Sequence, residues 1–134
     1  MNSHHSLHEL IYVSIIGATV NAKVVAAIAN HARTANKSLG ITGVLVFDGE
    51  RFCQFLEGGR KQVVKLFERI SVDDRHVDVD MVHQGPIESR HFQRFAMGYA
   101  YLSDVDLIGT VASLDGANAR SSFVELSGLI DFGV

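Results

Sequence analysis

The segment from residue 40 to residue 59, GITGVLVFDGERFCQFLEGG, constrains the fold more than any other part of the chain. Two β-rich runs of about seven residues flank the dipeptide Asp48-Gly49, which is one of the strongest short-range signals for a tight hairpin turn. The pattern therefore predicts two neighbouring antiparallel strands in the middle of the chain.

Further strands and helices are predicted on both sides of this hairpin. Residues 9–16, ELIYVSII, form a β-branched and aromatic run typical of a buried strand. Residues 21–36 and 60–71 carry apolar side chains at intervals of three and four, which indicates two amphipathic helices. Residues 77–84, which we expect to end at Gly85-Pro86, and residues 96–102 complete the pattern as strands.

The resulting order predicts an α+β, ferredoxin-like βαββαββ sheet with both helices on one face. Apolar residues near 107–111 and 123–130 recur at helical spacing and predict two further helices. We therefore expect residues 1–102 to form one domain. Residues 103–134 would form a helical extension that packs either on the uncovered face of the sheet or on a partner subunit.

Composition narrows the classes of protein that remain. A chain of 134 residues with 47% hydrophobic residues can bury a single core, and its one Cys excludes an internal disulfide. A net charge of −3, without a long basic block, gives no electrostatic footprint for nucleic acid or anionic lipid. No apolar run is long enough to cross a membrane, and the N-terminus lacks a secretory pattern. We expect a cytoplasmic protein whose partner is a small molecule or another protein.

Polar residues embedded in apolar runs are the candidate functional residues, because burying an unpaired polar group is costly. If the first and third strands are neighbours, Tyr12 and Gln54 face one pocket. Asn36 lies on the core-facing stripe of the first helix, and a continuing second helix would bring Arg69 and Asp73 together. Each also has a purely structural explanation: strand packing, an edge position, a helix end or a solvated ion pair.

Catalytic patterns fit the chain poorly. Cys53 alternates with Gln54, so we expect a buried structural thiol that faces away from that amide. The seven His residues show no metal-ligand spacing, and there is no GxGxxG or GxxxxGK[ST] loop. The chain is not expected to be an enzyme.

Five motifs in this order resemble the BLUF family of flavin-binding blue-light sensors. They are LIYVS at 10–14, Asn36-x-x-x-GITG, FCQFLEG at 52–58, DDRH at 73–76 and RFAMG at 94–98. The resemblance runs from about residue 8 to 102. It implies a ferredoxin-like fold with the isoalloxazine ring held between the two helices.

The resemblance also implies roles for single residues. Tyr12 matches the light-dependent electron donor, and Gln54 matches the amide between that tyrosine and flavin N5 and C4=O. Met97 matches the methionine near this glutamine. Cofactor-binding side chains would be Asn36 at the C4=O and N3 edge, Arg69 and Asp73 on the pyrimidine side, and Ile28, together with Gln54 and Tyr12.

Two positions depart from the family pattern. Phe95 stands where the family often has Trp, and the chain has no Trp at all, so signalling by movement of a tryptophan cannot apply. Ala35 stands where the family often has Asn, so one phosphate-side or ribityl contact is missing.

The function implied is that of a photoreceptor with non-covalently bound FAD, or alternatively FMN. Blue light would drive electron and then proton transfer from Tyr12, after which Gln54, rotated or tautomerised, donates a new hydrogen bond to flavin C4=O. Phe95 and Met97 would relay the change to the C-terminal helices and to an unidentified protein partner, and the protein would be a homo-oligomer. The alternatives are a light-independent, ferredoxin-like ligand-binding regulatory module and a small flavin-dependent enzyme.

Overall fold

The computed structural model describes residues 6–17, 21–73, 75–102, 106–130 and 132. In these ranges, no helix is both long enough and apolar enough to cross a membrane. The elements, in chain order, are β1 (Leu7–Ile16), α1 (Ala22–Leu39), β2 (Thr42–Phe47), β3 (Arg51–Gly59), α2 (Arg60–Ser71), β4 (His76–Ile87), β5 (Gly98–Tyr101), α3 (Leu107–Ala112) and α4 (Gly116–Ser127).

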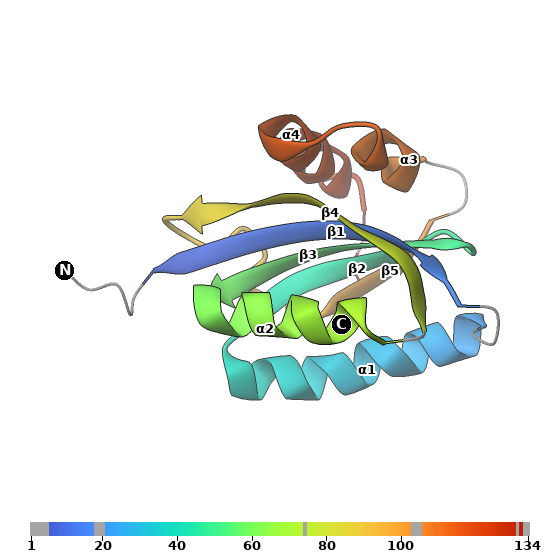
Figure 1. Ribbon diagram of the computed structural model, residues 1–134, viewed down its shortest axis with the longest axis horizontal. Helices are drawn as coiled ribbons and strands as arrows, with labels where there is room; N and C mark the ends of the chain where they lie inside the picture. Colours follow the sequence, from blue (N-terminus) through green and yellow to red (C-terminus); the bar gives the residue numbers. More distant parts are fainter. Residues whose placement is uncertain (1–5, 18–20, 74, 103–105, 131, 133–134) are drawn as a thin grey trace.

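The five strands form one sheet in the order β4-β1-β3-β2-β5 (Figure 1). Strand β3 runs antiparallel to both of its neighbours, β1 and β2, which are therefore parallel to one another and joined by α1. This split βαβ arrangement confirms the predicted ferredoxin-like fold. Strand β5 adds to the far edge, parallel to β2.

The turn between β2 and β3 forms as predicted. The Asp48 carboxylate accepts hydrogen bonds from the backbone N–H groups of Glu50 and Arg51. Gly49 has a φ of 102°, a conformation that side-chain-bearing residues rarely adopt. Local turn chemistry thus sets the register that places Leu45 opposite Gln54.

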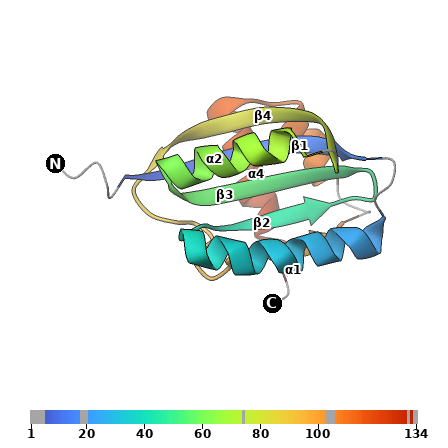
Figure 2. The same cartoon turned by 60° about the horizontal axis from the view of Figure 1, so that its bottom comes forward.

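Helices cover both faces of the sheet. Figures 1 and 2 show α1 and α2 side by side on one face, with α3 and α4 on the other. The core under α1 and α2 includes Leu10, Leu45 and Leu56, whereas the core under α3 and α4 includes Ile11, Phe55 and Phe123. Successive residues of one strand therefore reach different cores, as the alternation of a pleated strand requires. The C-terminal helices pack on this chain's own sheet.

Several boundaries differ from the sequence-based prediction. Strand β4 continues through Gly85-Pro86 to Ile87, because β4 is an edge strand and can tolerate a residue that lacks an N–H donor. Helix α1 runs on to Leu39, where Gly40 in a left-handed conformation ends it. Strand β5 is shorter than predicted, and α4 ends at Ser127, before the apolar residues at 129 and 130.

Candidate functional site

Tyr12 and Gln54 lie directly opposite each other in the β1–β3 register. Both side chains are buried, and the Tyr12 hydroxyl donates a hydrogen bond of 2.5 Å to Gln54 Oε1. The expectation that these two residues face one pocket is confirmed. The hydrogen bond also fixes the orientation of the amide, because its oxygen is directed to the phenol.

The nitrogen of the same amide is directed to Met97. Gln54 Nε2 donates to Met97 Sδ at 3.4 Å, and the Met97 side chain is buried in the core under α1 and α2. A thioether sulfur is a weak acceptor, so this nitrogen keeps the capacity to bond a stronger one. Tyr12 of β1, Gln54 of β3 and Met97, which directly precedes β5, therefore form one hydrogen-bonded chain.

Helix α1 holds the segment that carries Met97. Asn36 Nδ2 donates to the carbonyl of Ala96 at 2.9 Å, and the Arg33 guanidinium donates twice to the carbonyl of Met97. The sequence analysis did not identify Arg33. Its spacing of three residues from Asn36, which puts both on one helix face, was the only available signal.

A cavity of about 240 Å³ opens between α1 and α2 above these residues. Six of the seven predicted site residues line it: Tyr12, Ile28, Asn36, Gln54, Arg69 and Asp73. The seventh, Met97, reaches the cavity only through Gln54. The remaining lining residues are His31, Ala32, Ala35, Leu39, Leu45, Leu66, Ile70, Arg75 and His76. The lining thus combines apolar side chains with polar groups that could orient a bound molecule, as small-molecule sites do.

The predicted pairing of Arg69 with Asp73 is wrong. Helix α2 ends at Ser71, so the two residues do not share a helical turn. The Asp73 carboxylate instead accepts hydrogen bonds from the backbone N–H and the guanidinium of Arg75. These bonds lower the pKa of Asp73 to about 2. Within the part of the chain that the structure describes, Arg69 has no hydrogen-bond or ion-pair partner.

His76 is a site residue that the sequence analysis did not single out, although it ends the DDRH motif. Its ring lies 4.8 Å from the ring of Phe52 and 5.9 Å from that of Tyr12, between centroids. Its Nδ1 is 3.0 Å from the Ser14 hydroxyl. Burial lowers the pKa of this imidazole, which favours the neutral ring.

Burial also shifts the pKa values of Tyr12 and Cys53. It raises the pKa of the Tyr12 phenol, so the hydroxyl keeps its proton at neutral pH. It raises the pKa of Cys53 as well, and this thiol belongs to the core on the opposite face of the sheet. The prediction that Cys53 faces away from Gln54 is confirmed. No group of three potential metal ligands occurs among the described residues.

A family model described as "BLUF: Sensors of blue-light using FAD" matches residues 7–98. The chain belongs to the BLUF family. Matching relatives include the beta subunit of the Euglena longa photoactivated adenylate cyclase, which is 36% identical over 87 residues. The blue light- and temperature-regulated antirepressor BluF of Escherichia coli K12 is 34% identical over 73 residues.

These BLUF relatives are much longer proteins. The matched segment covers 65% of this chain but 10% of the cyclase subunit, and 54% of this chain but 18% of the antirepressor. The chain therefore spans about a tenth of the length of the cyclase subunits it matches.

Two solved structures match nearly the whole chain. The dark-state structure of BlrB has a TM-score of 0.69 at 28% identity, covering 94% of this chain and 91% of that one. The photo-activated state of BlsA has a TM-score of 0.81 at 24% identity. The match covers 96% of this chain and 99% of that one, and it shows that the two share a fold. Both comparisons include the C-terminal helices, which lie outside the family match.

The residues of the cavity suit the FAD that defines the BLUF family. An isoalloxazine ring is flat and apolar on its faces but has carbonyl acceptors and an N–H donor along one edge. The cavity offers apolar walls from Ile28, Leu45 and Leu66, and polar groups that both donate and accept. Among the described residues, the Arg69 guanidinium has no partner and the Gln54 amide nitrogen bonds only to the Met97 sulfur. Both groups are therefore suited to such an edge.

Proposed function

We propose that this protein is a blue-light photoreceptor that binds FAD non-covalently between α1 and α2. The observation that carries the proposal is the hydrogen-bonded chain from Tyr12 through Gln54 to Met97 at the floor of the cavity. The chain contains a phenol that can be oxidised and an amide whose oxygen and nitrogen can exchange positions. Both groups are buried.

Four side chains are proposed to hold the cofactor. Asn36 directs its nitrogen to the Ala96 carbonyl, which leaves its oxygen to accept from the N–H of the flavin edge. Arg69 supplies free donors for a carbonyl, and Asp73, kept ionised by Arg75, supplies an acceptor. Ile28 contributes an apolar wall.

When bound, flavin supplies the absorption of blue light and an excited state that accepts an electron. The Tyr12 phenol is the proposed electron donor, and its proton moves along the existing hydrogen bond to Gln54 Oε1. Charge recombination returns the electron to Tyr12 and a proton comes back from Gln54, so there is no net reaction. Gln54 remains changed, by rotation or by tautomerisation, and directs a new donor toward the ligand edge.

Rearrangement of Gln54 alters its bond to Met97, and this is how the signal is proposed to leave the cavity. Met97 lies in the core under α1 and α2, whereas Phe95, two residues earlier, packs on the core under α3 and α4. The Phe95 ring lies 6.1 Å from that of Phe132, near the C-terminus. A shift of the segment that carries Phe95 and Met97 would therefore change the relative populations of two conformations of the C-terminal region.

The output is proposed to be an interaction with another protein and not a reaction at the cavity. A homo-oligomeric state and a cytoplasmic location complete the proposal. The cyclase activity in the names of several relatives belongs to proteins about ten times the matched length.

An absorption spectrum before and after blue illumination tests the function. We expect a yellow protein with a red shift that appears without reductant and reverses in the dark. A purified chain that does not take up flavin would support a light-independent ligand-binding module instead. Sustained oxidation of NAD(P)H would support a flavin-dependent enzyme.

A further inference from the structure

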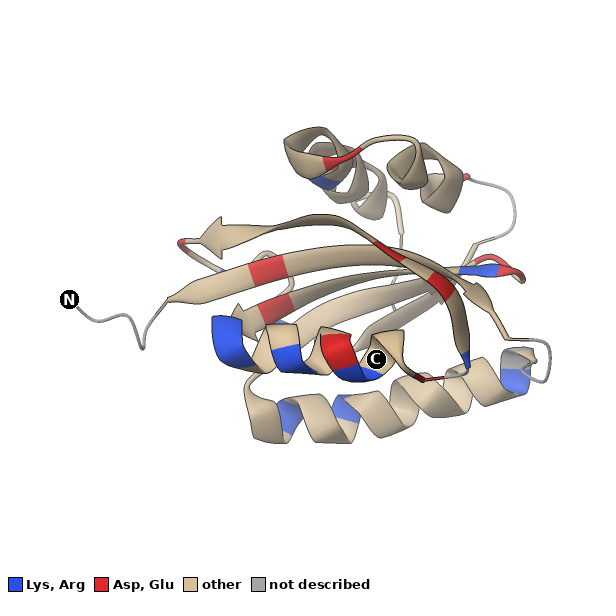
Figure 3. Ribbon diagram, in the orientation of Figure 1, with Lys and Arg blue, Asp and Glu red and all other residues tan. Residues whose placement is uncertain are grey.

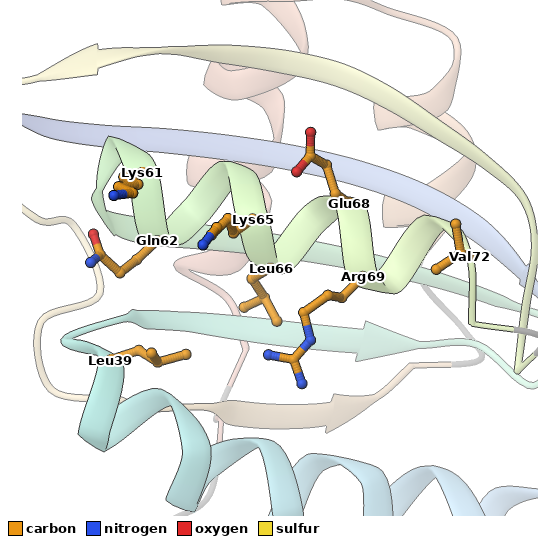
Figure 4. A pocket seen from close by; sticks show the side chains of 8 residues that line it. All are labelled: Leu39, Lys61, Gln62, Lys65, Leu66, Glu68, Arg69 and Val72. Atoms are coloured by element: carbon orange, nitrogen blue, oxygen red, sulfur yellow. The ribbon is translucent and has the colours of Figure 1, made fainter.

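A fully buried carboxylate, Glu57, lies on the face of the sheet opposite the cavity. It comes two positions after Phe55 in β3, so both side chains point to the core under α3 and α4. Glu57 lines neither the cavity nor the hollow along α2 that Figure 4 shows. Burying an ionised group is costly unless partners compensate for the lost water, so its hydrogen bonds indicate what it does.

The Glu57 carboxylate binds the loop that joins β4 to β5, residues 88–97. Its Oε2 accepts a hydrogen bond from the backbone N–H of His91 at 2.5 Å, and its Oε1 accepts from that of Phe92 at 2.8 Å. The Thr42 hydroxyl is a third donor, at 3.3 Å. Hydrogen bonds to an ionised acceptor are stronger than those between neutral groups. Glu57 therefore fixes the β4–β5 loop at two successive residues.

The same loop carries Met97, whose sulfur accepts from Gln54. The backbone N–H of Phe95 donates to the carbonyl of Phe92 at 3.0 Å, so a single turn connects the part held by Glu57 to the part that bears Met97. The Phe95 carbonyl accepts from the N–H of Gly43 at 2.9 Å. Strand β3 thus holds one end of this short connection, and α1 and β2 hold the other.

From these contacts we infer that Glu57 is a positioning residue for the light response. By fixing the β4–β5 loop, it places the Met97 sulfur against the Gln54 amide. The inference rests on the proposed function, since Gln54 is the group that changes in light. Glu57 itself lines no part of the cavity, so it acts only through the loop.

The anchored part of the loop also contacts the C-terminal helices. The Phe92 ring is buried and lies 5.0 Å from the ring of Phe55 and 6.1 Å from that of Phe123 in α4, between centroids. Glu57 thus holds the loop at the point where it passes between the sheet and α4. Any displacement of Met97 starts from this fixed point.

A second buried carboxylate provides a matched control. Glu9 stands directly opposite Glu57 in the β1–β3 register, and Figure 3 shows the acidic positions side by side on these strands. Its carboxylate bonds to Arg120 of α4 and His83 of β4. Among the described residues, it has no hydrogen bond to the β4–β5 loop. The two carboxylates share their burial and their face of the sheet but hold different elements.

Methionine methyl NMR on the full chain as purified, in the dark, tests the placement of Met97. The chain has three methionines, and the spectrum of Met97→Leu identifies the signal of interest. Glu57→Gln replaces one acceptor oxygen with an NH₂ group, so at least one loop N–H loses its bond. We expect the Met97 methyl resonance to shift and that of Met81 to stay in place. Glu9→Gln should shift neither.

The rate of dark recovery tests the consequence for the light response. Glu57→Gln should keep the red shift, because Tyr12 and Gln54 are intact. Recovery should slow by roughly two- to fivefold, the scale of one lost hydrogen bond. Glu9→Gln should recover at the rate of the unmodified protein, which separates positioning of the loop from a general loss of stability.

Arg90→Met keeps the inference testable if Glu57→Gln does not fold. Arg90 is half-buried and holds the same loop from outside, where its guanidinium donates to the carbonyls of Gly40 and Glu57 and to the Thr42 hydroxyl. This variant should shift the Met97 resonance and slow recovery in the same direction as Glu57→Gln.

Two results would overturn the inference. One is a Met97 resonance that stays in place in both Glu57→Gln and Arg90→Met, and the other is an equal shift in Glu9→Gln. Absence of a red shift in the unmodified protein would instead contradict the proposed function. The methyl resonance would still report whether Glu57 places Met97, since that measurement needs no light.

Discussion

The Arg33 guanidinium donates two hydrogen bonds to the backbone carbonyl of Met97, at 3.0 Å from Nε and 2.8 Å from a terminal nitrogen. The sulfur of the same Met97 accepts from Gln54. One residue is thus held at its carbonyl by α1 and touches the candidate photoactive amide through its side chain. Helix α1 therefore influences the cavity floor through Met97.

Replacing Arg33 tests this link. Arg33→Met removes the donors while keeping much of the apolar stem, so Met97 should loosen and its contact with Gln54 should weaken. Because that contact belongs to the dark arrangement, we expect dark recovery to slow by roughly two- to fivefold, equivalent to less than about 1 kcal/mol. Time-resolved absorption measures the rate of dark recovery. Lys37→Met, on the same helix, is the control, and identical recovery in both variants would contradict the link.

Tyr12→Phe should retain flavin and lose the light-induced red shift, since the ring stays but the oxidisable hydroxyl does not. It also leaves the buried Gln54 Oε1 without its donor, which should lower the free energy of unfolding by about 1–3 kcal/mol. Absorption spectra and urea unfolding measure the two effects. Tyr99→Phe, on the same core, is the matched control. A normal photocycle in Tyr12→Phe would refute the donor role.

Gln54→Leu should also abolish the red shift, because leucine occupies similar space without a donor or an acceptor. Flavin should remain bound, since the apolar walls of the cavity and Arg69 are unchanged. The spectrum of the illuminated variant is the measurement. A shift of normal size in Gln54→Leu would show that the amide does not carry the response.

Acid should weaken the fold through Asp73. Hydrogen bonds from Arg75 lower its pKa from 3.8 to about 2, so its contribution is present above pH 4 and is lost as the pH falls toward 2. The group is partly exposed, so the contribution should be below about 1 kcal/mol. Urea unfolding across this range should show a shallower pH dependence in Asp73→Asn. An identical slope in both proteins would contradict the assignment.

Arg120 joins the C-terminal helices to the sheet. Its Nε donates to the buried carboxylate of Glu9 at 2.6 Å, and His83 Nε2 lies 2.7 Å from the same oxygen. Arg120→Met should leave that carboxylate underpaired and lower the free energy of unfolding by about 1–3 kcal/mol. Urea unfolding measures this loss of stability. In a protein that already carries Glu9→Gln, Arg120→Met should lower the free energy of unfolding by less. Strict additivity of the two changes would contradict a direct link.

Much of the fold could be predicted because its determinants are local. The Asp48-Gly49 turn depends on two adjacent residues, and the helix at 60–71 depends on a spacing of three and four, so both were correctly predicted. Once the order of strands was known, the neighbouring positions of β1 and β3 followed from the topology. The meeting of Tyr12 and Gln54 could therefore be anticipated without coordinates.

The sequence by itself thus determined the strand and helix order and the polar residues that must be buried. Only the tertiary structure decided that Asp73 pairs with Arg75, that β4 passes through Pro86 at a sheet edge, and that Arg33 holds Met97. The physical reason is that these outcomes depend on which of several available partners lies nearest once the chain is packed. Arg33 and Met97 are 64 positions apart, and no local periodicity encodes their contact.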